Sequence, residues 1–180
     1  MNFQETLEKR RSVRNYIADK EIDKDTINKL IQAASLAPSW KNSQTGRYYC
    51  VISKDMLIKF RESCLPEFNI NNTINASAYI VTTFIKNRAG FDRTSGMPIN
   101  EAGNGWGFYD LGLQNENLVL KAKDMGLDTL IMGIRDEKKI RTMLSIPEEQ
   151  IIVAVIAVGY SDAKPDMPKR KNIEEIVSFF

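Results

Sequence analysis

The segment from Ile151 to Tyr160 most constrains the fold of this chain. It reads IIVAVIAVGY, with apolar residues at consecutive rather than alternating positions. A strand of this kind is apolar on both faces and needs a packed layer on each side, so we expect it at the centre of a sheet. The chain has 180 residues, of which 43% are hydrophobic, and this is enough for one domain spanning residues 1–180.

Apolar spacing and helix-capping residues predict most of the other elements. Asp23 is a suitable N-cap for a helix that closes at Pro38, and Gly126 would end a long central helix that begins near Gly107. Phe3 and Leu7, four residues apart, predict a short amphipathic helix that ends in a cationic turn at Arg10 to Arg14. The remaining predicted elements are helices over 54–65 and 136–144, strands over 48–53, 78–86 and 127–134, and a loop over 69–75. No repeat or linker divides the chain.

Two segments depart from this regular pattern. Residues 87–105 are rich in glycine, include Pro98 and show no periodicity, which predicts a mobile excursion that serves as a lid. Residues 173–180 keep an apolar character that includes Phe179 and Phe180. An apolar terminus of this kind is expected to dock on another surface, such as a second subunit.

The chain contains no histidine. This excludes a Ser-His-Asp triad, the usual zinc sites and an imidazole general base. We therefore predict no metal site and no catalytic side chain, and expect a cofactor to supply any reactivity. Cys50 and Cys64 are too far apart for a CxxC motif, and their apolar and helical surroundings predict buried free thiols.

The overall charge gives no reason to expect nucleic acid or membrane as a partner. The formal net charge is only +2, from 25 basic and 23 acidic residues. No apolar run approaches the roughly 20 residues of a membrane-spanning helix, and the N-terminal residues lack the apolar segment of a signal peptide. We expect a cytoplasmic location.

Two cationic clusters are candidate anion sites. The first holds Arg10, Arg11, Ser12 and Arg14, whose guanidinium groups and hydroxyl suit a phosphate or a polyol, and the alternative is a solvated basic helix end. The second cluster runs from Lys169 to Lys171. It could bind one dianionic ligand together with the first cluster, and the alternative is a tail that only adds solubility. No dinucleotide or P-loop glycine motif is present, so side chains would have to bind the phosphate.

The polar loop from Pro38 to Gln44 is a third candidate. Its amides and hydroxyls are suitable donors and acceptors for the edge of a flat heteroaromatic ring, although an ordinary turn has the same composition. Trp40 could cover a ligand face or fill a subunit interface.

Five landmarks together resemble the nitroreductase family. They are RRSVRNY near the start, APSWKNSQ about twenty-five residues later, Gln114-Asn115 in the central helix, Met132-Gly133 at a strand end and PKRK near the C-terminus. Their order and spacing match over nearly the whole chain. The resemblance implies an α+β fold with a central mixed, mainly antiparallel β-sheet flanked by helices, in an intertwined homodimer built by the central helix and the tail.

The resemblance also implies one FMN per subunit, bound at the dimer interface. Arg10, Ser12 and Arg14 match ribityl, phosphate and ring-edge contacts, with Arg11 contributing through backbone or phosphate. The loop that reaches the flavin matches Pro38, Ser39, Trp40 and Asn42, and two further cofactor contacts match Asn69 and Asp110. The strand end beside the flavin N5 matches Met132 and Gly133, and the distal phosphate clamp matches Lys169 and Lys171. Part of the loop would come from the partner subunit.

The implied activity is hydride transfer from NADH or NADPH through the flavin to a small electron-poor aromatic acceptor, a nitroaromatic or a quinone, in a ping-pong sequence. One alternative is a module that stores or senses FMN without rapid turnover. A second alternative is a nucleic-acid binder that uses the two cationic clusters.

Overall fold

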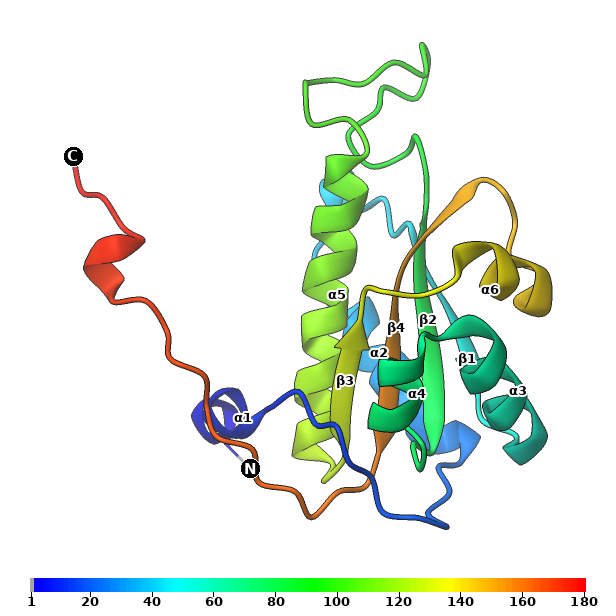
Figure 1. The fold of residues 1–180 in the computed structure, drawn as a ribbon. Coiled ribbons are helices and arrows are strands. Elements are labelled where there is room, and N and C mark those ends of the chain that lie inside the picture. The colour runs from blue at the N-terminus through cyan, green and yellow to red at the C-terminus, as the bar shows by residue number, and fades with distance from the viewer. Residues whose placement is uncertain (1) are drawn as a thin grey trace.

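The computed structural model describes residues 2–180 and folds them into helices around one sheet (Figure 1). The helices are α1 (Phe3–Lys9), α2 (Lys24–Ser35), α3 (Lys54–Cys64), α4 (Glu67–Asn72), α5 (Gly105–Asp124) and α6 (Glu137–Leu144). The strands are β1 (Gly46–Val51), β2 (Ala78–Ile85), β3 (Asp128–Met132) and β4 (Gln150–Gly159). Short 3₁₀ turns lie at Trp40–Asn42 and Ile173–Glu175.

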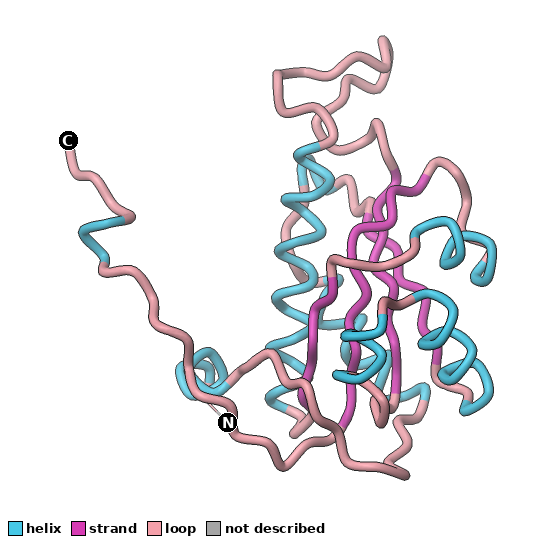
Figure 2. Tube along the Cα trace, viewed as in Figure 1, coloured by secondary structure: helices cyan, strands magenta, loops and turns pink. Residues whose placement is uncertain are grey.

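The four strands form a single sheet in the order β1-β2-β4-β3, and every neighbouring pair is antiparallel (Figure 2). The apolar segment at 151–160 is β4, an interior strand, as its two apolar faces predict. The parallel contribution is an isolated bridge between Ser12 and Thr129. The predicted α+β class with a mainly antiparallel sheet is confirmed.

Helices cover both faces of the sheet. On one face, Leu30 of α2 and Leu118 of α5 pack with Ile156 of β4 in one buried cluster. On the other face, Phe60 of α3 and Ile140 of α6 pack in a second cluster. A two-sided core explains why β4 carries no polar face.

Close packing of α5 on the sheet depends on a glycine. A Cβ on Gly107 would collide with the ring of Phe84 on β2. At the other end of α5, Gly126 has a φ of 78°, the left-handed conformation that ends helices and that glycine adopts without steric cost. The predicted helix and its stop are confirmed.

Two sequence-based predictions are wrong. Residues 69–75 were expected to be loop, but their first part belongs to α4, which begins after Pro66 and buries Asn69. A partly buried hydrogen bond from the Asn69 side chain to the Ile134 carbonyl favours helix here over the poor helix propensity of asparagine. Cys50 is exposed on β1, whereas Cys64 is fully buried, as predicted, and burial raises the pKa of its thiol to about 11.

The excursion at 87–105 and the tail extend from opposite ends of this body (Figure 1). The excursion is closed on itself by hydrogen bonds, including Asn87 N–H to Asn104 Oδ1 at 2.7 Å and Ile99 N–H to Gly90 O at 2.8 Å. The tail passes α1 and then leaves the rest of the chain, with Phe179 and Phe180 exposed. No helix among residues 2–180 is both long and apolar enough to cross a bilayer.

Candidate functional site

The segment after α1 runs beside the edge strand β3. Val13 donates its backbone N–H to the Thr129 carbonyl at 3.0 Å, next to the bridge between Ser12 and Thr129. Successive side chains of an extended segment point to opposite sides. Val13 is buried and lines a cavity of about 470 Å³ together with Arg11, whereas Ser12 and Arg14 are exposed. Alternation thus places the side chain of Arg11 away from those of Ser12 and Arg14.

The end of β3 opens into free space. A Cβ built on Gly133 would meet no atom within 4 Å, and Met132 before it is buried. Two side chains hold the following backbone: Arg135 donates to the Gly133 carbonyl at 2.9 Å, and Asn69 donates to the Ile134 carbonyl at 3.0 Å. The strand end is therefore both fixed and accessible, so a flat group could approach its backbone.

Arg135 is a positioning residue that the sequence analysis missed. Its other guanidinium nitrogen donates to the Ile152 carbonyl on β4, so it ties the end of β3 to the neighbouring strand. Burial lowers the pKa of Arg135. Nothing in the sequence distinguishes it from other arginines, because both of its acceptors are backbone carbonyls that only the folded sheet brings together.

The loop from Pro38 to Asn42 is held by Asp110 of α5. Both oxygens of Asp110 accept the backbone N–H of Trp40, at 3.1 and 3.0 Å, and Oδ2 also accepts the Ser43 hydroxyl at 3.4 Å. Burial raises the pKa of Asp110, and these two hydrogen bonds oppose that rise. In this chain Asp110 positions the loop, and its direct contact with a cofactor stays a prediction.

The loop has an unusual backbone. Lys41, Asn42 and Gln44 all have positive φ values, of 45°, 54° and 47°. Non-glycine residues rarely adopt this region, which costs about 1 kcal/mol or more each and persists only where surrounding contacts enforce it. Asp110 supplies such contacts.

Replacing Asp110 with alanine should therefore release the loop. The Trp40 N–H and the Ser43 hydroxyl would lose their acceptor, which is expected to lower the free energy of unfolding by about 1–3 kcal/mol. Chemical denaturation measures this loss, and amide hydrogen exchange at Trp40 should become faster. Glu101→Ala, an exposed carboxylate in the same half of the chain, is the control, and an equal effect of both substitutions would contradict the anchoring role.

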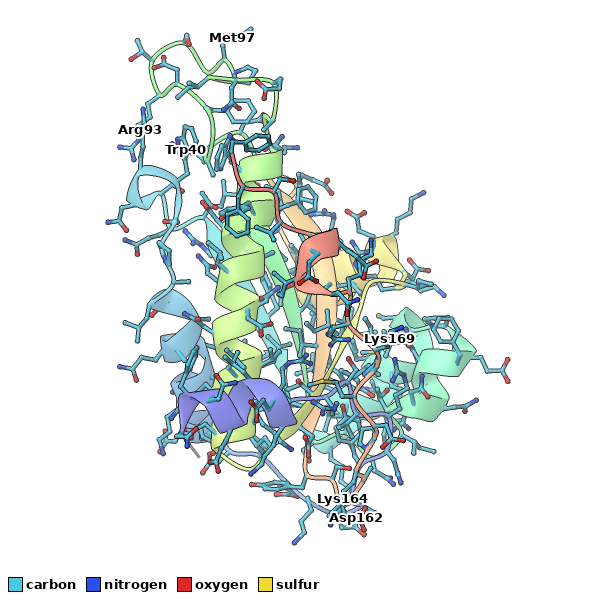
Figure 3. The ribbon with its side chains drawn as sticks, turned by 90° about the vertical axis from the view of Figure 1, so that its left-hand side faces the viewer. Trp40, Arg93, Met97, Asp162, Lys164 and Lys169 are labelled. Atoms are coloured by element: carbon cyan, nitrogen blue, oxygen red, sulfur yellow. The ribbon has the colours of Figure 1, made fainter. Side chains whose placement is uncertain are left out.

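The tail lysines are not brought to the strand end within this chain. Lys169 and Lys171 are exposed and make no hydrogen bond or ion pair with the rest of residues 2–180. Figure 3 shows Lys169 on the tail, with Trp40 and Arg93 together at the end of the molecule that carries the excursion. The predicted phosphate clamp thus requires either movement of the tail or a second chain.

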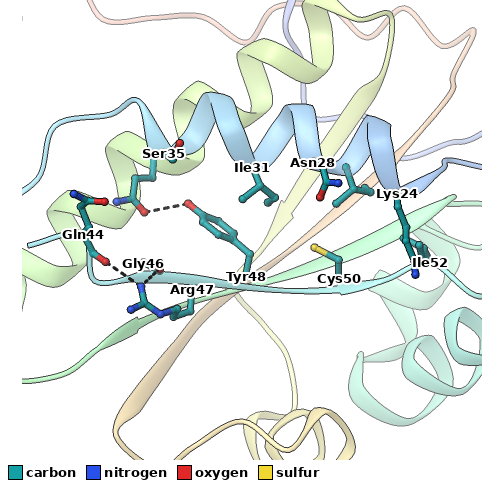
Figure 4. Close-up of a pocket in the computed structure, with 12 residues that line it drawn as sticks. Lys24, Asn28, Ile31, Ser35, Gln44, Gly46, Arg47, Tyr48, Cys50 and Ile52 are labelled. Atoms are coloured by element: carbon teal, nitrogen blue, oxygen red, sulfur yellow. Dashed lines mark hydrogen bonds between the residues drawn. The ribbon is translucent and has the colours of Figure 1, made fainter.

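A larger cavity, of about 640 Å³, lies elsewhere, between α2 and β1 (Figure 4). None of the predicted cofactor residues lines it. Its main polar contact is already made, because the Tyr48 hydroxyl donates to Gln114 Oε1 at 3.1 Å. No lining residue carries a buried side-chain polar atom without a partner. The size of this cavity therefore does not make it a better candidate for the cofactor site than the residues beside β3.

The residues beside β3 fit the chemistry of FMN. Arg10, Ser12 and Arg14 offer charge-assisted and hydroxyl hydrogen bonds suited to a phosphate and a polyol. Ile131, which is 49% exposed on β3, offers apolar surface near Gly133. A ligand that joins an anion, a polyol and a flat ring would use all three features.

Comparisons with known proteins identify similar sequences and structures. A family profile described as "Nitroreductase family" matches residues 7–160. A protein of Archaeoglobus fulgidus, assigned as an NADH dehydrogenase/NAD(P)H nitroreductase, is 31% identical over 87% of this chain and 84% of its own length.

Solved structures show the same fold. A nitroreductase family protein from Clostridium difficile 630 superposes with a TM-score of 0.78 at 24% identity, covering 99% of this chain and 98% of that one. A protein of Exiguobacterium sibiricum, assigned as a nitroreductase and solved in complex with FMN, superposes with a TM-score of 0.86 at 22% identity, covering 100% and 98%.

Proposed function

Because this chain belongs to the nitroreductase family, we propose that it is an FMN-dependent oxidoreductase. It would transfer hydride from NADH or NADPH to an electron-poor acceptor such as a nitroaromatic or a quinone. The observation that carries the proposal is the arrangement along β3: the segment with the exposed donors of Ser12 and Arg14 pairs with Thr129 of this strand, and the strand ends at the open backbone of Gly133. The FMN named for the Exiguobacterium sibiricum protein supports it.

Each residue of the site has a defined task in this proposal. Arg10, Ser12 and Arg14 would bind the ribityl chain and the phosphate, and Arg11, whose side chain faces the other cavity, would contribute through its backbone. Gly133 leaves room for the ring, while Asn69 and Arg135 hold the backbone that the ring would contact.

The bound flavin would accept hydride from the nicotinamide and pass it to the acceptor in a second half-reaction, a ping-pong sequence. The protein's own residues orient the ring and place positive charge near it, which favours the reduced, more anionic state. Protons would come from solvent, so the absence of histidine is no obstacle.

A homodimer would complete the site. Lys169 and Lys171 lie on the exposed tail and make no hydrogen bond or ion pair within residues 2–180, and the loop at Trp40 is held to α5 through Asp110. Both features are expected if one chain supplies them to the site of a second copy. The exposed apolar residues of the tail would then be buried in the assembly; they are Ile173, Ile176, Val177, Phe179 and Phe180. A cytoplasmic location stays a prediction.

Removing the tail lysines tests the phosphate assignment. Replacing Lys169 and Lys171 with alanine should weaken FMN binding about tenfold or more and change riboflavin binding little, because riboflavin has no phosphate. Fluorescence titration of both flavins measures the two dissociation constants. Lys20→Ala with Lys59→Ala removes the same charge elsewhere and is the control. Equal losses for FMN and riboflavin would refute the assignment.

The alternative is a module that stores or senses FMN without rapid turnover. Stopped-flow mixing of the FMN-loaded protein with NADH and with NADPH separates the two functions. A reductase would bleach the flavin within the time of a catalytic cycle, whereas a storage module would leave it oxidised.

A further inference from the structure

The excursion and the loop beside it enclose a groove rich in positive charge. Two adjoining cavities of about 360 and 390 Å³ share Arg88, Asp92 and Arg93 in their lining. Arg47 and Lys41 complete the positive charge, one in each cavity. We refer to the space lined by these residues, together with Trp40 and Thr45, as the cationic groove.

The cations of this groove outnumber its counter-ions, because Asp92 is the one carboxylate in the lining of the two cavities and its charge acts on Lys41. Lys41, Arg88 and Arg93 make no side-chain hydrogen bond or ion pair within residues 2–180. Arg47 donates from one nitrogen to two carbonyls, those of Gln44 and Gly46, at 2.9 and 2.7 Å. Gathering like charges without an anion is unfavourable, so the arrangement is better suited to a bound anion than to an empty surface.

Asp92 does not neutralise the groove. Its Oδ1 accepts three hydrogen bonds from its own turn, from Thr94 N–H at 3.1 Å, Ser95 N–H at 2.8 Å and the Ser95 hydroxyl at 3.0 Å. The carboxylate therefore shapes the excursion. These bonds lower the pKa of Asp92 and keep it ionised, yet four cationic side chains line the groove against this one carboxylate.

Two buried polar groups lining the groove have no partner. Thr45 is 2% exposed, and its Oγ1 makes no hydrogen bond. The indole N–H of Trp40 is likewise buried and unpaired. A buried polar atom without a partner costs about 1–3 kcal/mol, so its occurrence calls for an explanation. Thr45 lines one of the two adjoining cavities and Trp40 the other, and anion oxygens bound in these cavities would give the two groups acceptors.

The ring contacts fix the position of the groove. Trp40 packs on Trp106 of α5 with centroids 4.3 Å apart, and Trp106 donates to Asn100 Oδ1 of the excursion at 3.0 Å. The loop, the helix and the excursion are thus joined through these two indoles. Trp40 belongs both to the groove and to the loop that the proposed function places near a flavin (Figure 3).

We propose that the cationic groove binds a phosphate group of a small-molecule ligand. Guanidinium forks match phosphate oxygens in pairs, and the hydroxyl of Thr45 and the indole of Trp40 add neutral donors. Two sources carry this chemistry, the 2′-phosphate of a reduced nicotinamide dinucleotide and free inorganic phosphate. The first source rests on the proposed function, whereas the phosphate site itself does not.

Calorimetric titration of the FMN-saturated protein tests the proposal, with 2′,5′-ADP, 5′-AMP and inorganic phosphate as probes at low ionic strength. Arg88→Ala with Arg93→Ala should weaken 2′,5′-ADP about tenfold or more. The control is Lys20→Ala with Lys59→Ala, which changes net charge equally and should leave binding within about twofold. Thr45→Val should weaken the probe without lowering thermal stability, because the native hydroxyl has no partner to lose.

The three probes identify the source. Tighter binding of 2′,5′-ADP than of 5′-AMP and inorganic phosphate would assign the groove to the 2′-phosphate of the nicotinamide donor, whereas equal binding of all three would assign it to free phosphate. Absence of binding, or equal weakening in the arginine and lysine variants, would overturn the proposal. Failure to retain FMN would instead count against the proposed function, and probe binding would then be measured on the same protein without flavin.

Discussion

Replacing Gly133 with leucine should abolish tight FMN binding while the protein without flavin stays folded. A Cβ at position 133 would have no protein atom within 4 Å, so the single chain without flavin can accommodate the first atom of a leucine side chain. In the proposed complex that same space holds the ring. Overpacking of a filled site costs about 1–3 kcal/mol, and each 1.4 kcal/mol is tenfold in affinity, so FMN should weaken about tenfold to a hundredfold.

Two measurements separate this effect from misfolding. Thermal unfolding of the flavin-free variant should match that of the wild type within a few degrees, and FMN titration should show the loss. Gly133→Ala is the graded control and should weaken FMN less than leucine does. A leucine variant that binds FMN normally would show that the ring does not lie against the end of β3.

Removing residues 166–180 should convert the dimer to a monomer and release the flavin. This segment carries the tail lysines and six exposed apolar side chains, including Met167, Phe179 and Phe180. Burying each apolar side chain of this size contributes about 1.5–3 kcal/mol, so the deletion removes several kcal/mol of association free energy. Sedimentation velocity at micromolar concentration should give a monomer, and desalting should leave it colourless.

Two further variants separate the loss of the dimer from the loss of phosphate binding. The first substitutes serine for four apolar tail residues, Ile173, Ile176, Val177 and Phe179, and it should dissociate the dimer although the lysines remain. The double lysine variant should stay dimeric and lose mainly its preference for FMN over riboflavin. A truncated chain that remains a dimer with bound FMN would contradict a site built from two chains.

Much of the fold could be predicted because its signals are local. The consecutive apolar residues of β4 require a covered interior strand, Asp23 caps α2 through the Thr26 N–H at 2.7 Å, and Gly126 ends the central helix. The boundaries of these elements moved by only one or two residues. Asn69 was harder, because the hydrogen bond that stabilises α4 joins it to a residue 65 positions away.

The candidate site was predictable in its residues but not in its geometry. The sequence indicated a cationic turn at Arg10 to Arg14, whereas the chain there is extended and pairs with Thr129. This pairing divides the cluster between two sides, and no local pattern shows it. The cationic groove was not predicted either. It forms only when Arg88 and Arg93 of the excursion lie beside Trp40, and these residues are far apart in the sequence.

One spectrum tests most directly whether this chain is a flavin reductase. The purified protein is incubated with FMN, desalted, and titrated anaerobically with NADH and then with NADPH. The visible flavin bands should stay with the protein and bleach with at least one of the two donors. A protein that loses FMN on desalting, or a bound flavin that remains oxidised with both donors, would contradict this function.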